Sequence, residues 1–379
     1  MEQTARRKGA LAVPAGDPLW NLLITRWKLP LPAILVMVVA VGAILVFGLG
    51  AVVSYRVHPR ADIVRVFDPG HLQYALLVQF VYTPLVWVMY LWQPLGIAGT
   101  LDSLRQADVI VETQDQSVEA FTRRMNRVLS GSRVFVAVVL TLLLVLVLET
   151  FVVIPQEALG RGQPFFWFYD KRFYLVVFVP ILYLTAYVTI VVVLKGILAL
   201  AWFYRLFRTF PARVHPLHPD GVGGFGALGS LAIKYGLIAV ALGVVGTTLT
   251  LSRLLAGTGQ LYLDSVLFYA SYVVLTPLTL VVPLWSAHQA MVSVRNEMLR
   301  DLSGGFDKAL EGMDSQQRGG GSSEMAWEHA AELRVRHKFV SETYPTWPLS
   351  LAGFRRFAIA AALPLITSAA SIMIDIVTA

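Results

Sequence analysis

The chain contains no cysteine among its 379 residues, and only 15% of its residues are charged. The absence of cysteine excludes disulfides, thiolate metal sites and cysteine nucleophiles. The low charge, together with 56% hydrophobic residues and a mean hydropathy of +0.64, is typical of a chain that lies in a lipid bilayer. We therefore expect an integral membrane protein rather than a soluble globule.

The sequence also lacks the short motifs that carry familiar chemistry. It has neither an HExxH zinc motif nor a GxSxG nucleophile turn. Its basic residues are spread over several segments instead of forming one stripe, so the formal charge of +7 has no need of a nucleic-acid partner. We expect neither an enzyme, nor a bound cofactor, nor a nucleic-acid-binding protein.

What the chain has instead is a series of apolar segments. Each reaches or approaches the roughly 20 residues that a helix needs to cross a hydrocarbon core. They predict an all-α polytopic membrane protein with seven transmembrane helices. The segments are 31–55, 72–95, 133–154, 173–200, 229–255, 262–287 and 354–378.

The distribution of basic residues predicts the orientation of these spans. With the N-terminus inside, the cytosolic segments hold 22 of the 31 Lys and Arg residues, against seven in the outer segments. This bias favours a cytosolic N-terminus and an external Ala379. The excess of Arg over Lys favours a bacterial source, so the expected location is a bacterial inner membrane.

The segments outside the membrane predict a cytosolic assembly unit. Residues 100–130 form an amphipathic pattern typical of a helix, and two further helical patterns follow the sixth span, the first of them leading into Gly304–Gly305. We expect these helices to form a compact anchor bundle. The expected division is 1–30 cytosolic, 31–287 the six-span bundle, 288–352 the anchor helices with a flexible linker at 314–323, and 353–379 the last span.

Two of the predicted spans carry polar residues on one face. In the sixth span Tyr272, Thr276 and Thr279 belong to a series that recurs at steps of three and four. In the last span Ser368, Ser371, Asp375 and Thr378 recur in the same way. Because lipid offers a hydroxyl no hydrogen-bond partner, both faces should turn toward other helices or toward water.

These two faces favour a homo-oligomeric ion channel, with a tetramer as the expected assembly. The last helix would line the pore with Ser368, Ser371, Asp375 and Thr378, and the sixth helix would lie behind it. A ring of Asp375 near the outer mouth would concentrate cations. Two alternatives remain open: a secondary transporter with a solute cavity inside one subunit, and a non-conducting membrane scaffold or signalling protein.

The loop from Arg213 to Gly229 has the most distinctive local sequence, RVHPLHPDGVGGFGALG. His215, His218 and Asp220 have the side chains of metal ligands, and a metal or small-ligand sensor is one interpretation. The other is a tight structured turn, in which the aspartate caps a neighbouring element and the glycines allow close packing. Among the residues inside the apolar runs, Lys195 and Lys234 lie near the cytosolic ends, where both can reach the headgroups by snorkelling.

The string HPDGVGGFGALG at 218–229 and the string TYPTWPLSLAGFRRF at 343–357 resemble sequences of uncharacterised bacterial polytopic membrane proteins. That resemblance implies no activity. In topology, with seven spans, a cytosolic helical anchor and a final span entered through PLSLAGF, the chain also resembles the insect olfactory and gustatory receptor channels. This second resemblance implies a tetramer whose last helix lines the pore.

Overall fold

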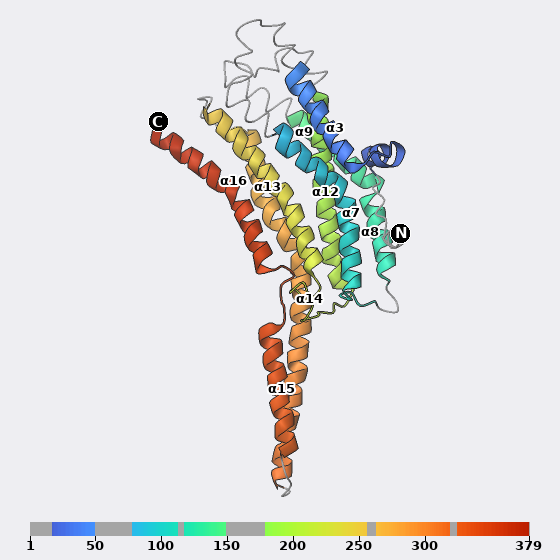
Figure 1. The fold of residues 1–379 in the computed structure, drawn as a ribbon, viewed down its shortest axis with the longest axis vertical. Helices are drawn as coiled ribbons and strands as arrows, with labels where there is room; N and C mark the ends of the chain where they lie inside the picture. The colour runs from blue at the N-terminus through green and yellow to red at the C-terminus, as the bar shows by residue number, and fades with distance from the viewer. Residues whose placement is uncertain are drawn as a thin grey trace.

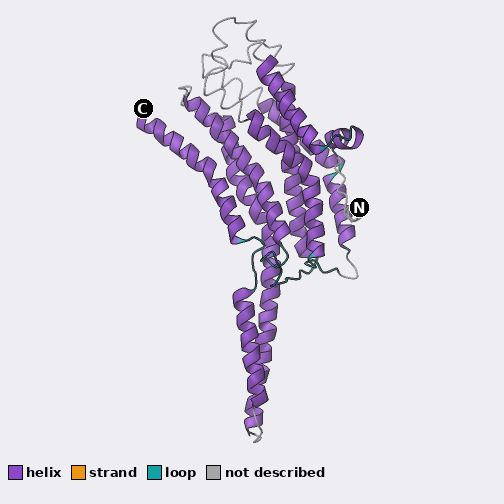
Figure 2. Ribbon diagram, in the orientation of Figure 1, coloured by secondary structure: helices purple, strands orange, loops and turns teal. Residues whose placement is uncertain are grey.

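The computed structural model describes residues 17–49, 78–112, 117–148, 179–255, 263–318 and 324–378. These residues are almost entirely helical, and the helices lie side by side in an elongated bundle from which a two-helix stalk projects (Figures 1 and 2). Two features of the sequence, the aromatic residues between Phe165 and Tyr174 and the acidic Glu149 in the third apolar segment, lie outside the described residues. The expected all-α class is confirmed.

The N-terminal part of the bundle begins with two short elements that run across the other helices. Helix α2 (Pro18–Trp20) continues into the π-helical turn η2 (Asn21–Arg26), which bends by 119° into helix α3. The elements that follow run along the bundle. They are α3 (Leu31–Ala43), η3 (Ile44–Leu49), η4 (Val78–Tyr82), α7 (Thr83–Gln106), α8 (Val118–Leu129) and α9 (Ser132–Leu148).

The C-terminal part consists of long helices. They are α12 (Val179–Thr209), α13 (Gly226–Leu255), α14 (Leu263–Arg318), α15 (Glu324–Thr343) and α16 (Leu351–Thr378). All seven apolar segments of the sequence thus overlap helices. Among the described residues, the helices Val118–Leu148, Tyr183–Thr209 and Tyr272–Asp314 are long and apolar enough to cross a membrane, and the bent pair α2–η2 and α3 makes a fourth if it is one span.

The expected single helix at 100–130 is wrong, because two helices occupy this range. Helix α7 ends at Gln106, and Asp108 then takes a φ of +51°, which interrupts the helical path. The backbone of 109–111 pairs with the loop after α12 through an isolated antiparallel bridge between Ile110 and Ala212. Ser117 then caps α8 by accepting a hydrogen bond from the Glu119 amide.

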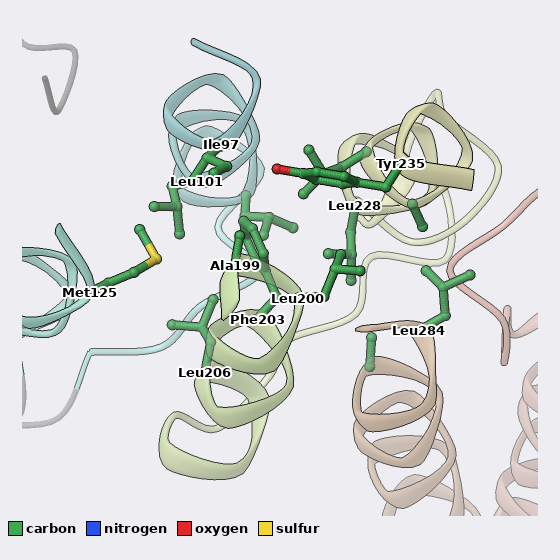
Figure 3. Packing of buried hydrophobic residues seen from close by; sticks show 14 of the residues in the cluster. Ile97, Leu101, Met125, Ala199, Leu200, Phe203, Leu206, Leu228, Tyr235 and Leu284 are labelled. Carbon is green, nitrogen blue, oxygen red and sulfur yellow. The ribbon is translucent and has the colours of Figure 1, made fainter. Parts of the chain in front are cut away.

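Helix α8 lies along the bundle instead of joining the helices of the stalk. Its apolar face is buried, and Phe121 makes edge-to-face contacts with Trp202 and Phe210 of α12 and the segment after it. Figure 3 shows Met125 of α8 on one side of α12, with Tyr235 and Leu228 of α13 on the other. Helix α12 is thus the central helix of the core at this end of the bundle.

The stalk, which we define as residues 288–318 and 324–343, is an extended antiparallel hairpin. Helix α14 runs without a break from the bundle into the stalk (Figure 1). It continues through Gly304–Gly305, into which the first helical pattern after the sixth predicted span leads. Helix α15 packs back along it with Ala330 and Val340 buried in the seam. The expected compact bundle is therefore wrong. Helix α14 also continues four residues beyond the expected start of the linker at 314, and 319–323 lie outside the described residues.

Candidate functional site

Three glycines of α13 allow close contacts with α16, with the segment just before it and with α14. Gly229, Gly236 and Gly243 are spaced by seven residues. At each of them a neighbouring group lies so close that an added Cβ would clash with it. A Cβ on Gly229 would lie 2.4 Å from the carbonyl oxygen of Pro348, just before α16, and one on Gly236 would lie 2.3 Å from the ring of Phe357. Small residues at regular spacing let membrane helices approach closely. We call this contact the glycine seam.

Tyr272 crosses the glycine seam from α14. Its ring lies against Gly243, where a Cβ would come within 2.7 Å, and its hydroxyl donates a hydrogen bond to the carbonyl oxygen of Ala361 in α16. Thr247 of α13 donates a second hydrogen bond, of 3.1 Å, to the carbonyl oxygen of Pro364. Both acceptors are backbone carbonyls close to Pro364, which lacks the N–H of a regular helix. The two hydrogen bonds fix the first half of α16 to the bundle.

The predicted polar face of the sixth span is therefore turned toward other helices. Tyr272 is buried against α13 and α16, and the enclosed hydroxyl oxygen of Thr276 has no hydrogen-bond partner among the described residues. Thr279 donates to the carbonyl oxygen of Thr276 at 2.9 Å and lines a small, partly open apolar cavity between α12, α13 and α14. The polar residues of this part of α14 therefore face neighbouring helices, and α14 packs against the first half of α16 through Tyr272.

The predicted polar face of the last span lies in the second half of α16. Ser368, Ser371, Asp375 and Thr378 all belong to this helix. In sequence they continue, at steps of four and three, the series of Ala361 and Pro364, whose carbonyls accept the hydrogen bonds from α14 and α13. Toward the C-terminus α16 diverges from α13 and α14 (Figures 1 and 2). The polar series thus begins at the anchored half and runs along the divergent half.

A second contact region, which we call the loop junction, joins α16 to the stalk and to the α12–α13 loop. The segment 344–350 leads from α15 into α16. The hydroxyl of Tyr344 donates a hydrogen bond to the carbonyl oxygen of Val214 at 3.3 Å. The ring of Pro345 packs on Gly223, where an added Cβ would lie 3.2 Å from the ring. The two strings that the sequence singles out, 213–229 and 343–357, are therefore packed against each other.

Helix α14 holds the other side of this connector. The imidazole of His288 stacks on the indole of Trp347, with centroids 4.2 Å apart and planes 18° apart. Its Nδ1 lies 2.6 Å from the carbonyl oxygen of Thr346, so Nδ1 carries the hydrogen and donates it. Arg295 donates to the carbonyl oxygen of Ser341 at 2.7 Å. These contacts tie the end of α15 and the connector to α14, so a movement of α15 along α14 acts on the start of α16.

Asp220 organises the α12–α13 loop from within. Its carboxylate accepts hydrogen bonds from the amides of Val222, Gly224 and Gly226, at 3.0, 3.1 and 2.8 Å, and so caps the start of α13. Partial burial alone would raise the pKa of this carboxyl, but the three amides together with His218 outweigh it, and the pKa is lowered from its usual value. The interpretation as a tight structured turn is confirmed.

The two histidines of this loop have protein partners. Nδ1 of His218 lies 2.9 Å from the Asp220 carboxylate, and Nε2 of His215 lies 3.5 Å from the carbonyl oxygen of Asp108. Within the described part of the chain, no three His, Cys, Asp or Glu side chains are grouped as a metal would require. A sensing role for His215, His218 and Asp220 stays a prediction.

Sequence reasoning missed the partners of both lysines. Lys195 does not snorkel but lies 3.6 Å from the buried carboxylate of Asp17, and Lys234 lies over the ring of Trp92 at 4.7 Å. No periodic signal points to Asp17, which is far away in sequence. The glycine seam, in contrast, has a visible signal in the repeat of glycine every seven residues along one helix.

Comparisons with models of protein families, with curated proteins and with solved structures find no match to this chain.

Proposed function

We propose that the chain is a subunit of a homo-oligomeric ion channel, with α16 lining the pore and α14 behind it. One observation carries the proposal: α16 is fixed to the bundle along its first half, while the half that carries the polar series diverges from it (Figure 1). A polar helix face that its own subunit leaves apart from the bundle is available to other copies of the chain.

The carboxylate of Asp375 and the hydroxyls of this face together favour a water-filled surrounding. A carboxylate at the centre of a bilayer costs about 3 kcal/mol, and the cost falls near the headgroups. Three hydroxyl residues, Ser368, Ser371 and Thr378, share its spacing and add further groups that lipid cannot satisfy. If several copies bring these faces to one axis, water and permeating cations satisfy them at once. Four copies is the number we propose.

The stalk supports assembly between copies. Trp327, Val335 and Phe339 of α15 are exposed at steps of eight and four, so they follow one another along the outer surface of the hairpin. A two-helix hairpin that exposes large apolar side chains in water gains stability when a neighbour covers them. We propose that the stalks of adjacent subunits meet there and that all seven apolar helices cross the bacterial inner membrane with the N-terminus inside.

A second candidate is a transporter, and one observation favours it. The polar series continues the register of Ala361 and Pro364, which face α13 and α14 of the same subunit. A solute path could then run within one subunit between α16 and the bundle. The small cavity between α12, α13 and α14 adds little to this candidate, because only Tyr235 and Thr279 bring hydroxyl groups to its lining.

Subunit counting and crosslinking separate the two candidates. The natural chain has no cysteine, so Ser371→Cys introduces the only thiol. For a channel with α16 at a common axis, oxidation of this variant yields disulfide-linked dimers within a symmetric oligomer seen by native mass spectrometry. Monomers without crosslinked product would contradict the channel and leave the transporter. The matched control is Ser132→Cys at the start of α9, which should not crosslink.

A further inference from the structure

A buried polar cluster lies away from α16, where the N-terminal segment meets α7 and α12. Asp17 is 4% exposed, and its Oδ1 accepts hydrogen bonds from the hydroxyls of Tyr90 at 2.9 Å and Tyr187 at 3.0 Å. Its Oδ2 lies 3.6 Å from Nζ of Lys195. The amides of Leu19 and Trp20 complete the set at 2.9 and 3.4 Å. One carboxylate thus has five donors around it.

The polar side chains from α7 and α12 form a site that suits a negatively charged acceptor. The hydroxyls of Tyr90 and Tyr187 donate to one carboxylate, and the ammonium group of Lys195 forms an ion pair with it. Without an acceptor there, these groups would be left with unmet hydrogen bonds and one unpaired charge, which is costly inside a protein. A carboxylate satisfies the hydroxyls and neutralises the ammonium group.

The segment that supplies the carboxylate is held in an uncommon conformation. We call residues 17–28 the strap. The strap contains the π-helical turn η2 and ends at Lys28, whose φ is +53°. A residue other than glycine in this region of backbone space is strained, and such strain persists only where the surroundings impose it. The strap is fixed at one end by Asp17 and continues at the other end into α3.

We propose that Tyr90, Tyr187 and Lys195 form a carboxylate-binding site whose resident ligand is Asp17, and that the strap is a releasable clasp on the α7–α12 seam. Docking of the strap covers Leu23, which is 3% exposed, and places Trp20 edge-to-face with Tyr90 at 6.0 Å. Loss of the carboxylate removes the anchor that opposes the strain at Lys28. The strap then leaves the bundle, while the helices that form the site keep their fold.

A thiol reporter on the strap tests this proposal without any measurement of conductance, so its outcome is independent of the channel proposal. Leu23→Cys places a single thiol on the buried side of the strap in a chain that has no other. The rate of its modification by N-ethylmaleimide is measured in nanodiscs, alone and combined with Asp17→Asn or Lys195→Met. We expect slow modification of the reporter alone. Because breaking a buried ion pair is strongly unfavourable, we expect modification about tenfold faster, or more, in both combinations.

The controls use groups of the same kind outside the cluster. Asp102→Asn on α7 and Lys234→Met on α13 should leave the modification rate unchanged. A second reporter, Ala232→Cys on the fully buried face of α13, should stay protected with Asp17→Asn. The proposal is overturned if the Leu23→Cys reporter reacts fast with the cluster intact, or if Asp17→Asn and Lys195→Met leave its rate unchanged. It is equally overturned if Ala232→Cys becomes reactive along with it, because the cluster would then hold the whole core and not a releasable strap.

Discussion

The hydroxyl of Tyr272 donates a hydrogen bond to the carbonyl oxygen of Ala361, and its ring passes the face of Gly243 to reach it. One side chain thereby joins α14, α13 and α16. The bond lies one turn before Pro364, where α16 has lost a backbone donor. The position of α16 relative to the bundle therefore depends on this contact and on the neighbouring bond from Thr247.

Removal of the Tyr272 hydroxyl should loosen α16 without changing the core. We expect Tyr272→Phe to lower the free energy of unfolding by about 1 kcal/mol, the usual value of one hydrogen bond. The larger effect should be local, as faster amide hydrogen exchange in residues 358–368. The control is Tyr204→Phe on α12, whose hydroxyl lies outside the seam. Equal exchange of 358–368 in the two variants would show that the bond does not hold α16.

The close approach at Gly229 should make this position intolerant of a methyl group. A Cβ there meets a backbone oxygen at 2.4 Å, and backbone cannot move aside as a side chain can. We expect Gly229→Ala to destabilise the protein by about 1 to 3 kcal/mol, the usual cost of overpacking. Gly304→Ala in the stalk is the matched control, because nothing lies within 4 Å of its added Cβ. This variant should stabilise the protein by up to about 1 kcal/mol through helix propensity. Thermal unfolding should therefore show a lower melting temperature for Gly229→Ala and an unchanged or higher one for Gly304→Ala.

Asp220 should contribute stability only while its carboxylate is ionised. Its folded pKa lies below the unfolded value of about 3.9, so the contribution is fully present above that value and is lost as the pH falls through the folded pKa. We expect Asp220→Asn to cost about 1 kcal/mol at neutral pH, since the carboxylate is partly exposed. The difference between the two proteins in thermal unfolding should shrink below pH 4. A difference that stays constant down to acidic pH would contradict the assigned role.

The stacking of Trp347 on His288 should couple the stalk to α16. We expect Trp347→Ala to cost about 1 kcal/mol and to raise amide exchange in 344–354, because the connector loses its hold on α14. Trp327→Ala, on the exposed surface of α15, removes the same side chain without this stacking. It should leave the exchange of 344–354 unchanged. If both variants raise it equally, the stacking has no special part in the coupling.

The helices were predictable from the sequence because long apolar runs leave few alternatives in a bilayer. The breaks between helices were not. The amphipathic pattern of 100–130 is interrupted at Asp108, and Ile110 pairs with Ala212. The local periodicity of the sequence contains no signal for this tertiary pairing. Gly304 and Gly305 have low helix propensity, which favours the end of a helix there. Helix α14 nevertheless continues through both glycines, in the part of it on which α15 packs. Tertiary contacts overrode local propensity in both cases.

The candidate site was predictable in part. The sequence identified the two strings at 213–229 and 343–357, and the structure packs them together. Of the two interpretations of the loop, the tight turn capped by Asp220 is the one that its hydrogen bonds support. The Asp17 cluster could not be predicted, because its partners Tyr90, Tyr187 and Lys195 are 73 to 178 residues away and carry no common pattern. Contacts that depend on three-dimensional proximity alone leave no such signal.

The most direct test of a pore along α16 is the conductance of the purified protein in planar bilayers, recorded for Ser371→Cys before and after a positively charged methanethiosulfonate reagent. We expect a cation current that the reagent blocks, and a smaller cation selectivity in Asp375→Asn. A current that is unaffected by the reagent and unchanged in Asp375→Asn would contradict the placement of this face on the conduction path.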